Sequence, residues 1–111
     1  MDYFKNIEPS TAVPLADLVQ IQPGQVVSRT LAQNRAVSVT LFAFSQGEEI
    51  STHQSEGDAM VQVLEGVGEL TIDGTAHLCS AGEAIVMPAG HPHAVRAVQN
   101  FKMLLTVVFP L

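Results

Sequence analysis

The sequence contains few basic residues. Five Lys and Arg side chains stand against 11 Asp and Glu, which gives a formal net charge of −6. The basic side chains are also scattered along the chain, at Lys5, Arg29, Arg35, Arg96 and Lys102. A surface that follows nucleic-acid phosphates needs clustered Lys and Arg, and so does a surface that binds anionic lipids. We therefore expect neither a nucleic-acid partner nor a membrane partner.

Cysteine is nearly absent, and long apolar runs are absent altogether. The single Cys79 cannot form a disulfide within one chain. Residues 1–10 hold no apolar run of the signal-peptide type, and the apolar residues 103–111 are far fewer than the roughly 20 that span a bilayer. These absences predict a soluble, cytoplasmic protein.

Tryptophan and low-complexity tracts are missing as well. Charged residues make up only 14% of the 111 residues, whereas hydrophobic residues make up 47%. A chain of this composition can bury enough apolar surface to fold, and this length supports one hydrophobic core rather than two. We expect a single domain.

Turn signals, by contrast, are abundant. Pairs such as Pro-Gly, Gln-Gly, Glu-Gly and Ala-Gly recur at short intervals between runs of Val, Ile, Leu and Phe. This spacing is typical of an all-β sandwich or barrel. The only helical candidate is residues 14–20, which would fit a lead-in strand equally well.

One hairpin is predicted within residues 68–80. Asp73-Gly74 separates GELTI from TAHLC, as a two-residue hairpin turn does. After this turn, Ala76 and Leu78 read as the inward-facing residues, which would place His77 and Cys79 outside.

Two predicted strands, residues 36–44 and 101–109, carry apolar side chains on both faces. Such strands need cover on both sides, either from a second sheet or from another subunit. We therefore expect a homodimer.

Strand alternation brings polar residues from two distant stretches onto defined faces. His53 and Ser55 are two residues apart and point the same way. His93, Val95 and Ala97 likewise share one face.

These stretches also carry a regular spacing of glycine, proline and histidine. In the first stretch, residues 47–66, the positions that define the spacing are Gly47, His53, Ser55, Ala59 and Gly66. Those of the second are Gly82, Pro88, Gly90, His93 and Ala97. The two stretches resemble the two motifs of the cupin superfamily. The first motif is a glycine, five residues, His-x-His, three or four residues, Glu, six residues and Gly. The second motif is Gly, five residues, Pro-x-Gly, two residues, His, three residues and Asn.

The resemblance covers residues 47–97 directly and implies a fold. Cupins are small antiparallel β-barrels of the jelly-roll type, also called a double-stranded β-helix, with the site inside the barrel mouth. For this chain it implies one domain, in which residues 1–35 form lead-in strands and residues 36–111 form the barrel core.

The departures from the motif concern the metal ligands. Cupins of the metal-binding kind use three His and one Glu, whereas this chain keeps His53 and His93 and has Ser55 and Ala59 at the other two positions. Two imidazoles suit Zn, Cu, Fe or Ni by chemical type, but they are one ligand short of the usual catalytic zinc site. The divalent transition metals that we consider for this site are Zn, Ni, Fe and Mn. Water, a substrate oxygen, His91 or Glu56 would have to complete the set.

The remaining candidates line a predicted pocket. Beside the histidines we place Ser55, Ala59, Val61, Met87 and His91 there, with a wall that is mostly apolar: Val61, Val63, Leu70, Ile72, Ile85, Met87 and Val95. Few polar groups in an apolar cup are typical of a small-molecule site.

Two functions follow from the resemblance, and no catalytic residue is assigned for either. One is a binding module that holds a small organic ligand, with or without a metal. The other is a metal-dependent enzyme of the dioxygenase or isomerase type that acts on a small organic acid or phenol. A metal-free acid–base enzyme using His53 or His93 is a third, weaker alternative.

Overall fold

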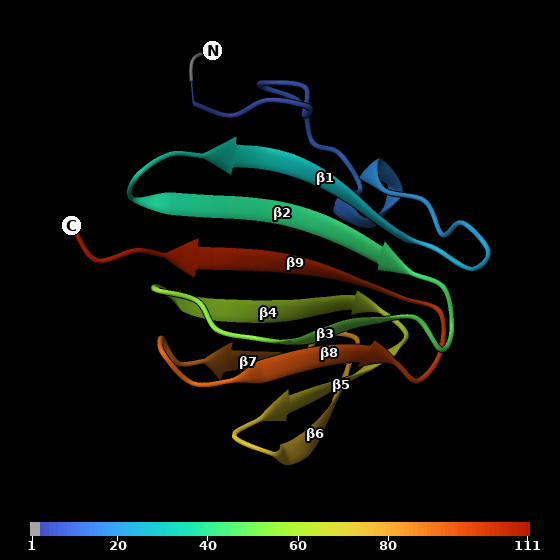
Figure 1. Ribbon diagram of the computed structural model, residues 1–111. Coiled ribbons are helices and arrows are strands. Elements are labelled where there is room, and N and C mark those ends of the chain that lie inside the picture. The colour runs from blue at the N-terminus through green and yellow to red at the C-terminus, as the bar shows by residue number, and fades with distance from the viewer. Residues whose placement is uncertain (1–2) are drawn as a thin grey trace.

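The computed structural model describes residues 3–111, which form nine strands and one short helical turn (Figure 1). The turn is a 3-10 helix, η1 (Leu15–Leu18). The strands are β1 (Val26–Gln33), β2 (Val37–Phe44), β3 (Glu49–His53), β4 (Asp58–Glu65), β5 (Val67–Ile72), β6 (Thr75–Ser80), β7 (Ala84–Met87), β8 (His93–Ala97) and β9 (Phe101–Val108). Among residues 3–111, no helix is long and apolar enough to cross a membrane.

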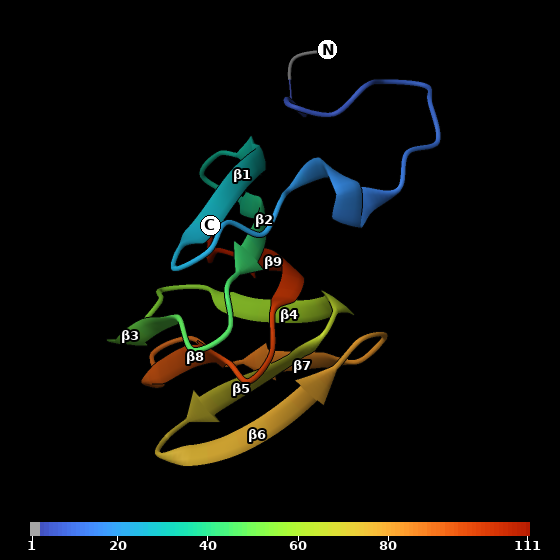
Figure 2. The ribbon, with the colours of Figure 1, turned by 90° about the vertical axis from the view of Figure 1, so that its right-hand side faces the viewer.

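The strands form two antiparallel sheets that face each other. One has the order β1-β2-β9-β4-β7 and the other the order β3-β8-β5-β6. The chain passes repeatedly from one sheet to the other, which is the path of a jelly roll (Figure 2). The prediction of an all-β jelly-roll barrel is therefore confirmed.

The predicted hairpin turn is present, but its strand register differs from our expectation. Asp73 and Gly74 both have positive φ, 51° and 80°, as a type I′ turn between β5 and β6 requires. Leu70 is fully buried, and its partner across the turn is His77, so the residues that share its face are the odd-numbered ones of β6. The prediction for this strand was wrong by one residue: Cys79 is 3% exposed and Leu78 is 69% exposed.

The main core lies between the sheets. Phe44 and Phe101 are fully buried, and their rings stack with centroids 4.6 Å apart. Gly68 of β5 lies against the Phe101 ring so closely that an added Cβ would come within 2.7 Å of it. Glycine is needed here because of close packing, not because of an unusual backbone angle.

A second apolar cluster lies on the outer face of the larger sheet. Its buried members are Val19, Leu31, Leu41 and Ala43. The segment that contains η1 covers β1 and β2 from outside, as Figure 2 shows. Part of the cover that strands β2 and β9 need therefore comes from the chain itself, and the homodimer remains a prediction.

Two basic side chains fasten this segment to the sheet. Lys102 is 6% exposed, and its ammonium donates to the carbonyl oxygen of Ala16 at 2.8 Å. The Arg29 guanidinium donates to the carbonyl oxygens of Leu18 (3.1 Å) and Asn6 (2.9 Å). Both cations thereby satisfy carbonyl groups that a short helical turn leaves without backbone donors.

Candidate functional site

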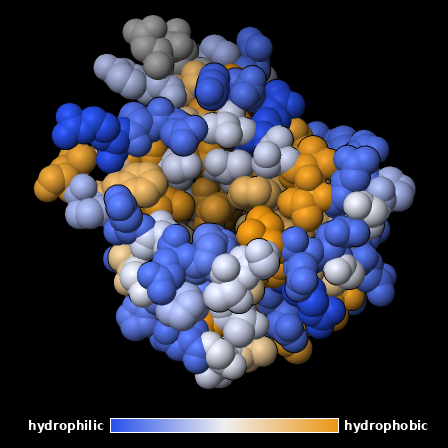
Figure 3. Space-filling model, viewed as in Figure 1, coloured by the Kyte–Doolittle hydropathy of each residue, from blue (hydrophilic) through white to orange (hydrophobic). Residues whose placement is uncertain are grey.

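A cavity of about 270 Å³ opens between the two sheets. Most of its wall is apolar, and the polar groups gather at the mouth. Its lining residues are Phe42, Ile50, His53, Gln54, Ser55, Ala59, Met87, His93, Val95, Met103, Leu105 and Val107. On the face shown in Figure 3, hydrophobic residues border a hollow at the height of β9.

The two motif histidines meet at this mouth. His53 is the last residue of β3 and His93 the first of β8, and they are direct partners across the strands. Their Nε2 atoms lie 3.1 Å apart, and their rings are nearly perpendicular, with an interplanar angle of 73°. His93 is 3% exposed, whereas His53 is exposed. One imidazole is thus buried in the wall and the other faces solvent.

Each ring is oriented by a carbonyl group two residues earlier in its own chain segment. The Nδ1–H of His53 donates to the carbonyl oxygen of Ser51 (2.9 Å), and the Nδ1–H of His93 donates to that of His91 (3.2 Å). A carbonyl only accepts, so in the neutral rings the proton is on Nδ1. The two Nε2 atoms are then free to accept: one shared proton makes their 3.1 Å contact a hydrogen bond, and a cation lying to one side of them could bind both.

A β-bulge turns His53 toward the cavity. His53 lies three residues after Ile50, so regular alternation would put their side chains on opposite faces. The register of β3 against β8 shifts between these two residues, and both line the cavity. Bulges are common next to sites because they redirect one side chain.

Burial lowers the pKa of His93 below its usual value. The neighbouring His53 lowers this pKa further, and the hydrogen bond to the His91 carbonyl opposes both effects. A lowered pKa keeps the imidazole neutral at neutral pH, which is the form that binds metal ions.

The other two motif positions offer little to a metal. Ser55 Oγ accepts a hydrogen bond from the backbone N–H of Gly57 at 3.2 Å. Ala59 lies on β4, is 2% exposed and presents only a methyl group to the cavity. In the part of the chain that the structure describes, no group of three or more His, Cys, Asp or Glu side chains could hold a metal ion.

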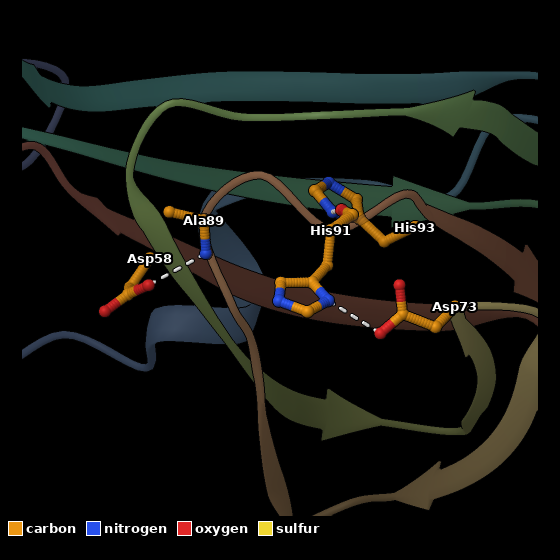
Figure 4. Close-up of polar contacts among 5 residues, drawn as sticks. All are labelled: Asp58, Asp73, Ala89, His91 and His93. Carbon is orange, nitrogen blue, oxygen red and sulfur yellow. Dashed lines mark hydrogen bonds and ion pairs between the residues drawn. The ribbon is translucent and has the colours of Figure 1, made fainter.

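The structure separates the predicted pocket residues into two groups. Ser55, Ala59 and Met87 line the cavity with the histidines. Val61 is fully buried in the core and is not among the lining residues. His91 points outward, because its Nδ1 pairs with the Asp73 carboxylate at 2.7 Å, and Figure 4 shows its ring directed away from His93.

Part of the predicted wall lies elsewhere, and another part was missed. Met87 and Val95 line the cavity as expected, whereas Val63 and Leu70 belong to the core beside it. The missed residues are mostly from β2 and β9: Phe42, Leu105 and Val107, together with Ile50 and Gln54. Alternation along β9 was the available signal, because residues 101, 103, 105 and 107 share one face.

A family model for the cupin domain matches residues 40–109 of this chain. The chain belongs to the cupin family. The resemblance inferred from the two motifs is therefore confirmed, and the family match extends beyond them on both sides.

Two solved structures resemble this cupin along nearly its whole length. A conserved protein of unknown function from Streptococcus pyogenes is 46% identical, with a TM-score of 0.97, and the match covers 100% of this chain and 97% of the other. A cupin superfamily protein from Desulfitobacterium hafniense is 31% identical, with a TM-score of 0.92, and the match covers 96% and 98% of the two chains.

A relative with a described activity is more distant. It is a 5-nitrosalicylic acid 1,2-dioxygenase from Bradyrhizobium sp., 29% identical over 84 residues. The match covers 70% of this cupin but only 41% of the dioxygenase, so the chain spans about two fifths of the length of that relative.

Proposed function

We propose that this cupin binds a small, largely apolar organic ligand in its barrel, together with a divalent transition metal held by His53 and His93. The observation that carries the proposal is the convergence of the two Nε2 atoms at 3.1 Å while both Nδ1 atoms face carbonyl oxygens. Metal-binding histidines are typically oriented through their other ring nitrogen in this way.

The separation of the two nitrogens fits a shared ion. Two nitrogens at about 2.0–2.1 Å from one metal, in neighbouring positions of a tetrahedral or octahedral sphere, lie about 2.8–3.4 Å apart. Imidazole nitrogens suit Zn, Fe and Ni, and Mn is a further candidate. Such an ion, when bound, supplies Lewis acidity to an oxygen of the ligand.

The cavity supports a small ligand. Its volume of about 270 Å³ lies near the lower end of the roughly 300–1,000 Å³ of most ligand pockets. Met103, Leu105 and Val107 of β9 form an apolar wall, while Gln54 and Ser55 provide hydrogen-bonding groups at the mouth. A compact molecule with one polar end would fit this distribution.

An enzymatic alternative is a dioxygenase that acts on a small organic acid or phenol. The similarity to the 5-nitrosalicylic acid dioxygenase favours it, because its match covers 70% of this chain, residues of the barrel included. In that case His53 and His93 would hold the metal, and the apolar wall would position the ring and limit access of water.

The test is elemental analysis of untagged protein after incubation with Zn²⁺, Ni²⁺, Fe²⁺ or Mn²⁺ and removal of unbound metal. We expect near-stoichiometric metal in the parent, and loss of it in His53→Ala and in His93→Ala. His77→Ala is the matched control, because His77 is an exposed histidine outside the cavity lining. A metal-free parent, or equal loss in His77→Ala, would contradict the proposal.

A further inference from the structure

The outer face of the larger sheet is covered on one side and open on the other. The segment that contains η1 packs over β1 and β2, where Leu31 and Leu41 are buried. Toward the other edge, Val86 of β7 and Val108 of β9 are 53% and 58% exposed. With two neighbours that also face outward, they form what we call the outer patch: Met60, Val86, Thr106 and Val108.

The outer patch has the character of an interaction surface. It borders a shallow hollow of about 360 Å³, with the exposed Asp58 at its rim. The adjacent strand β7 ends the sheet, and its residues Ala84–Met87 include no charged residue and no proline. Charges and prolines are what usually protect an open sheet edge, and a contiguous exposed apolar patch typically marks a binding surface.

The opposite edge of the same sheet carries two exposed aromatic side chains. Tyr3 is 80% exposed and Phe4 is 49% exposed. The next residue, Lys5, holds this stretch to β1, because its backbone N–H donates to the carbonyl oxygen of Leu31 at 2.8 Å. We call residues 3–5 the arm. The chain before η1, to which the arm belongs, extends away from both sheets in Figure 2.

The arm lies too far from the outer patch of its own copy to cover it. Strands β1 and β7 are the two ends of a five-stranded sheet. At about 4.8 Å per strand, they are about 19 Å apart. Tyr3 and Phe4 lie within about 7 Å of Lys5 along the chain. One face of the molecule thus presents an apolar hollow and a pair of aromatic side chains that do not meet.

A twofold axis brings the arm and the outer patch together. Strand β9 is the central strand of the five, so an axis parallel to it, between two outer faces in contact, places β1 of each copy over β7 of the other. The covered half of each face then meets the open half of its partner. This exchange of unlike halves is what a self-complementary surface requires.

The position along the strands also agrees. A twofold axis parallel to the strands leaves that position unchanged, so residues of one cross-strand row in one copy face the same row in the other. The arm is anchored beside Ala32, whose row crosses the whole sheet to β7. The row consists of Ala32, Val39, Thr106, Met60 and Val86.

Charge and area favour the same contact. Lys5 is an exposed cation on the arm, and Asp58 is an exposed carboxylate beside the outer patch. Opposite charges on facing surfaces guide association. Five strands of up to eight residues give a face of about 24 by 26 Å, so two such faces bury roughly 1,200 Å², the lower end of specific interfaces.

We propose that two copies of this chain associate through the outer faces of their larger sheets, with the arm of each copy seated on the outer patch of the other. The proposal is independent of the metal and the ligand proposed for the barrel. The outer face lies on the opposite side of the larger sheet from the cavity.

The first experiment measures the mass of the untagged full chain by sedimentation equilibrium over a range of concentrations. We expect a dimer in the parent. Val86→Glu should raise its dissociation constant at least about 30-fold, because the contact buries two copies of the substituted residue. Leu78→Glu is the matched control: it places the same carboxylate at an exposed leucine on the outer face of the smaller sheet, and it should associate like the parent.

The second experiment locates the arm. Phe4→Cys and Val86→Cys are each made in a Cys79→Ala background, mixed, and treated with a short bismaleimide. We expect cross-linked dimers in the mixture and few in either protein alone, because the axis brings residue 4 of one copy near residue 86 of the other. A mixture of Phe4→Cys with Leu78→Cys in the same background is the control and should give few cross-links.

Three results would overturn the proposal. One is a parent that is monomeric at every concentration, because the outer patch is then not an interface between copies. Another is a dimer that Leu78→Glu dissociates and Val86→Glu does not, because the contact then uses the smaller sheet. The third is a dimer without Phe4–Val86 cross-links, because the arm then lies elsewhere. Metal analysis of the parent is unaffected by each of these results, so the function proposed for the barrel is tested separately.

Discussion

Two neighbouring side chains of β6 lie on opposite sides of the sheet. Cys79 is 3% exposed in the core, and Leu78 is 69% exposed on the outside. Burial raises the pKa of the Cys79 thiol, and the Glu83 carboxylate raises it further. Because the thiolate is the reactive form, this cysteine should be chemically inert in the folded protein.

Thiol labelling tests this arrangement directly. We expect Cys79 to react with Ellman's reagent at least about tenfold more slowly in the folded protein than in urea. The matched control is Leu78→Cys in a Cys79→Ala background, which moves the thiol by one residue to the outer face and should label rapidly. Similar rates for the two folded proteins would show that the register of β6 differs from the one described.

The histidine pair and the β6 register show what could be predicted at individual positions. The spacing of glycine, proline and histidine identified His53 and His93, because turn glycines and ligand positions stand at fixed intervals in the motif. For β6, apolar residues at both 78 and 79 made alternation ambiguous. The two-residue turn would have resolved this, since it makes Leu70 and His77 partners on one face.

The loop between β7 and β8 positions the buried histidine. The Asp58 carboxylate accepts from the Ala89 N–H at 2.8 Å, and the Gly90 N–H donates to the Ser55 carbonyl at 2.9 Å (Figure 4 shows the first contact). The same loop carries the His91 carbonyl that orients His93. Asp58 thus acts on the site from outside the cavity.

Removing this support should weaken metal binding. We expect Asp58→Ala to lower the Ni²⁺ affinity about tenfold, because groups that orient metal ligands are typically worth 10–100-fold. Glu69→Ala is the control, since it removes a carboxylate that pairs with Arg96 at 3.4 Å away from the loop. Dialysis of both variants at a temperature well below their unfolding midpoints provides the measurement. Unchanged affinity in Asp58→Ala would show that the loop does not need this contact.

Some strands and turns could be predicted from the sequence, and others could not. Hairpin β5–β6 and strands β2 and β9 were predicted, because turn residues and β-branched runs are local signals. The bulge in β3 was not predicted, because an extra residue becomes visible only when the partner strand is known. Alternation along β9 indicates which of its residues share a face, but which face meets the cavity depends on the partners β2 and β4, which are distant in sequence, so Leu105 and Val107 were missed.

The position of the N-terminal segment, the residues before β1, also depends on contacts with residues that are distant in sequence. Val19, 3% exposed, packs with Leu31 and Leu41 on the outer face of the larger sheet. Lys102 anchors the segment from β9, a strand at the other end of the chain. The segment before β1 is therefore bound to the barrel by burial and by hydrogen bonds, and it should contribute to the stability of the whole molecule.

Adjacent substitutions in this segment measure that contribution. Val19→Ser removes a buried side chain worth about 1.5–3 kcal/mol, which in a domain of this size lowers the unfolding midpoint by about 10 °C. Gln20→Ser changes an exposed residue, whose side chain donates only to the Asp17 carbonyl, and should stay within about 0.5 kcal/mol of the parent. Thermal unfolding followed by circular dichroism gives both values. If the segment is loosely attached, the two variants will unfold at the parent's temperature. If it covers the sheet as described, only Val19→Ser will unfold earlier, in a single transition with the barrel.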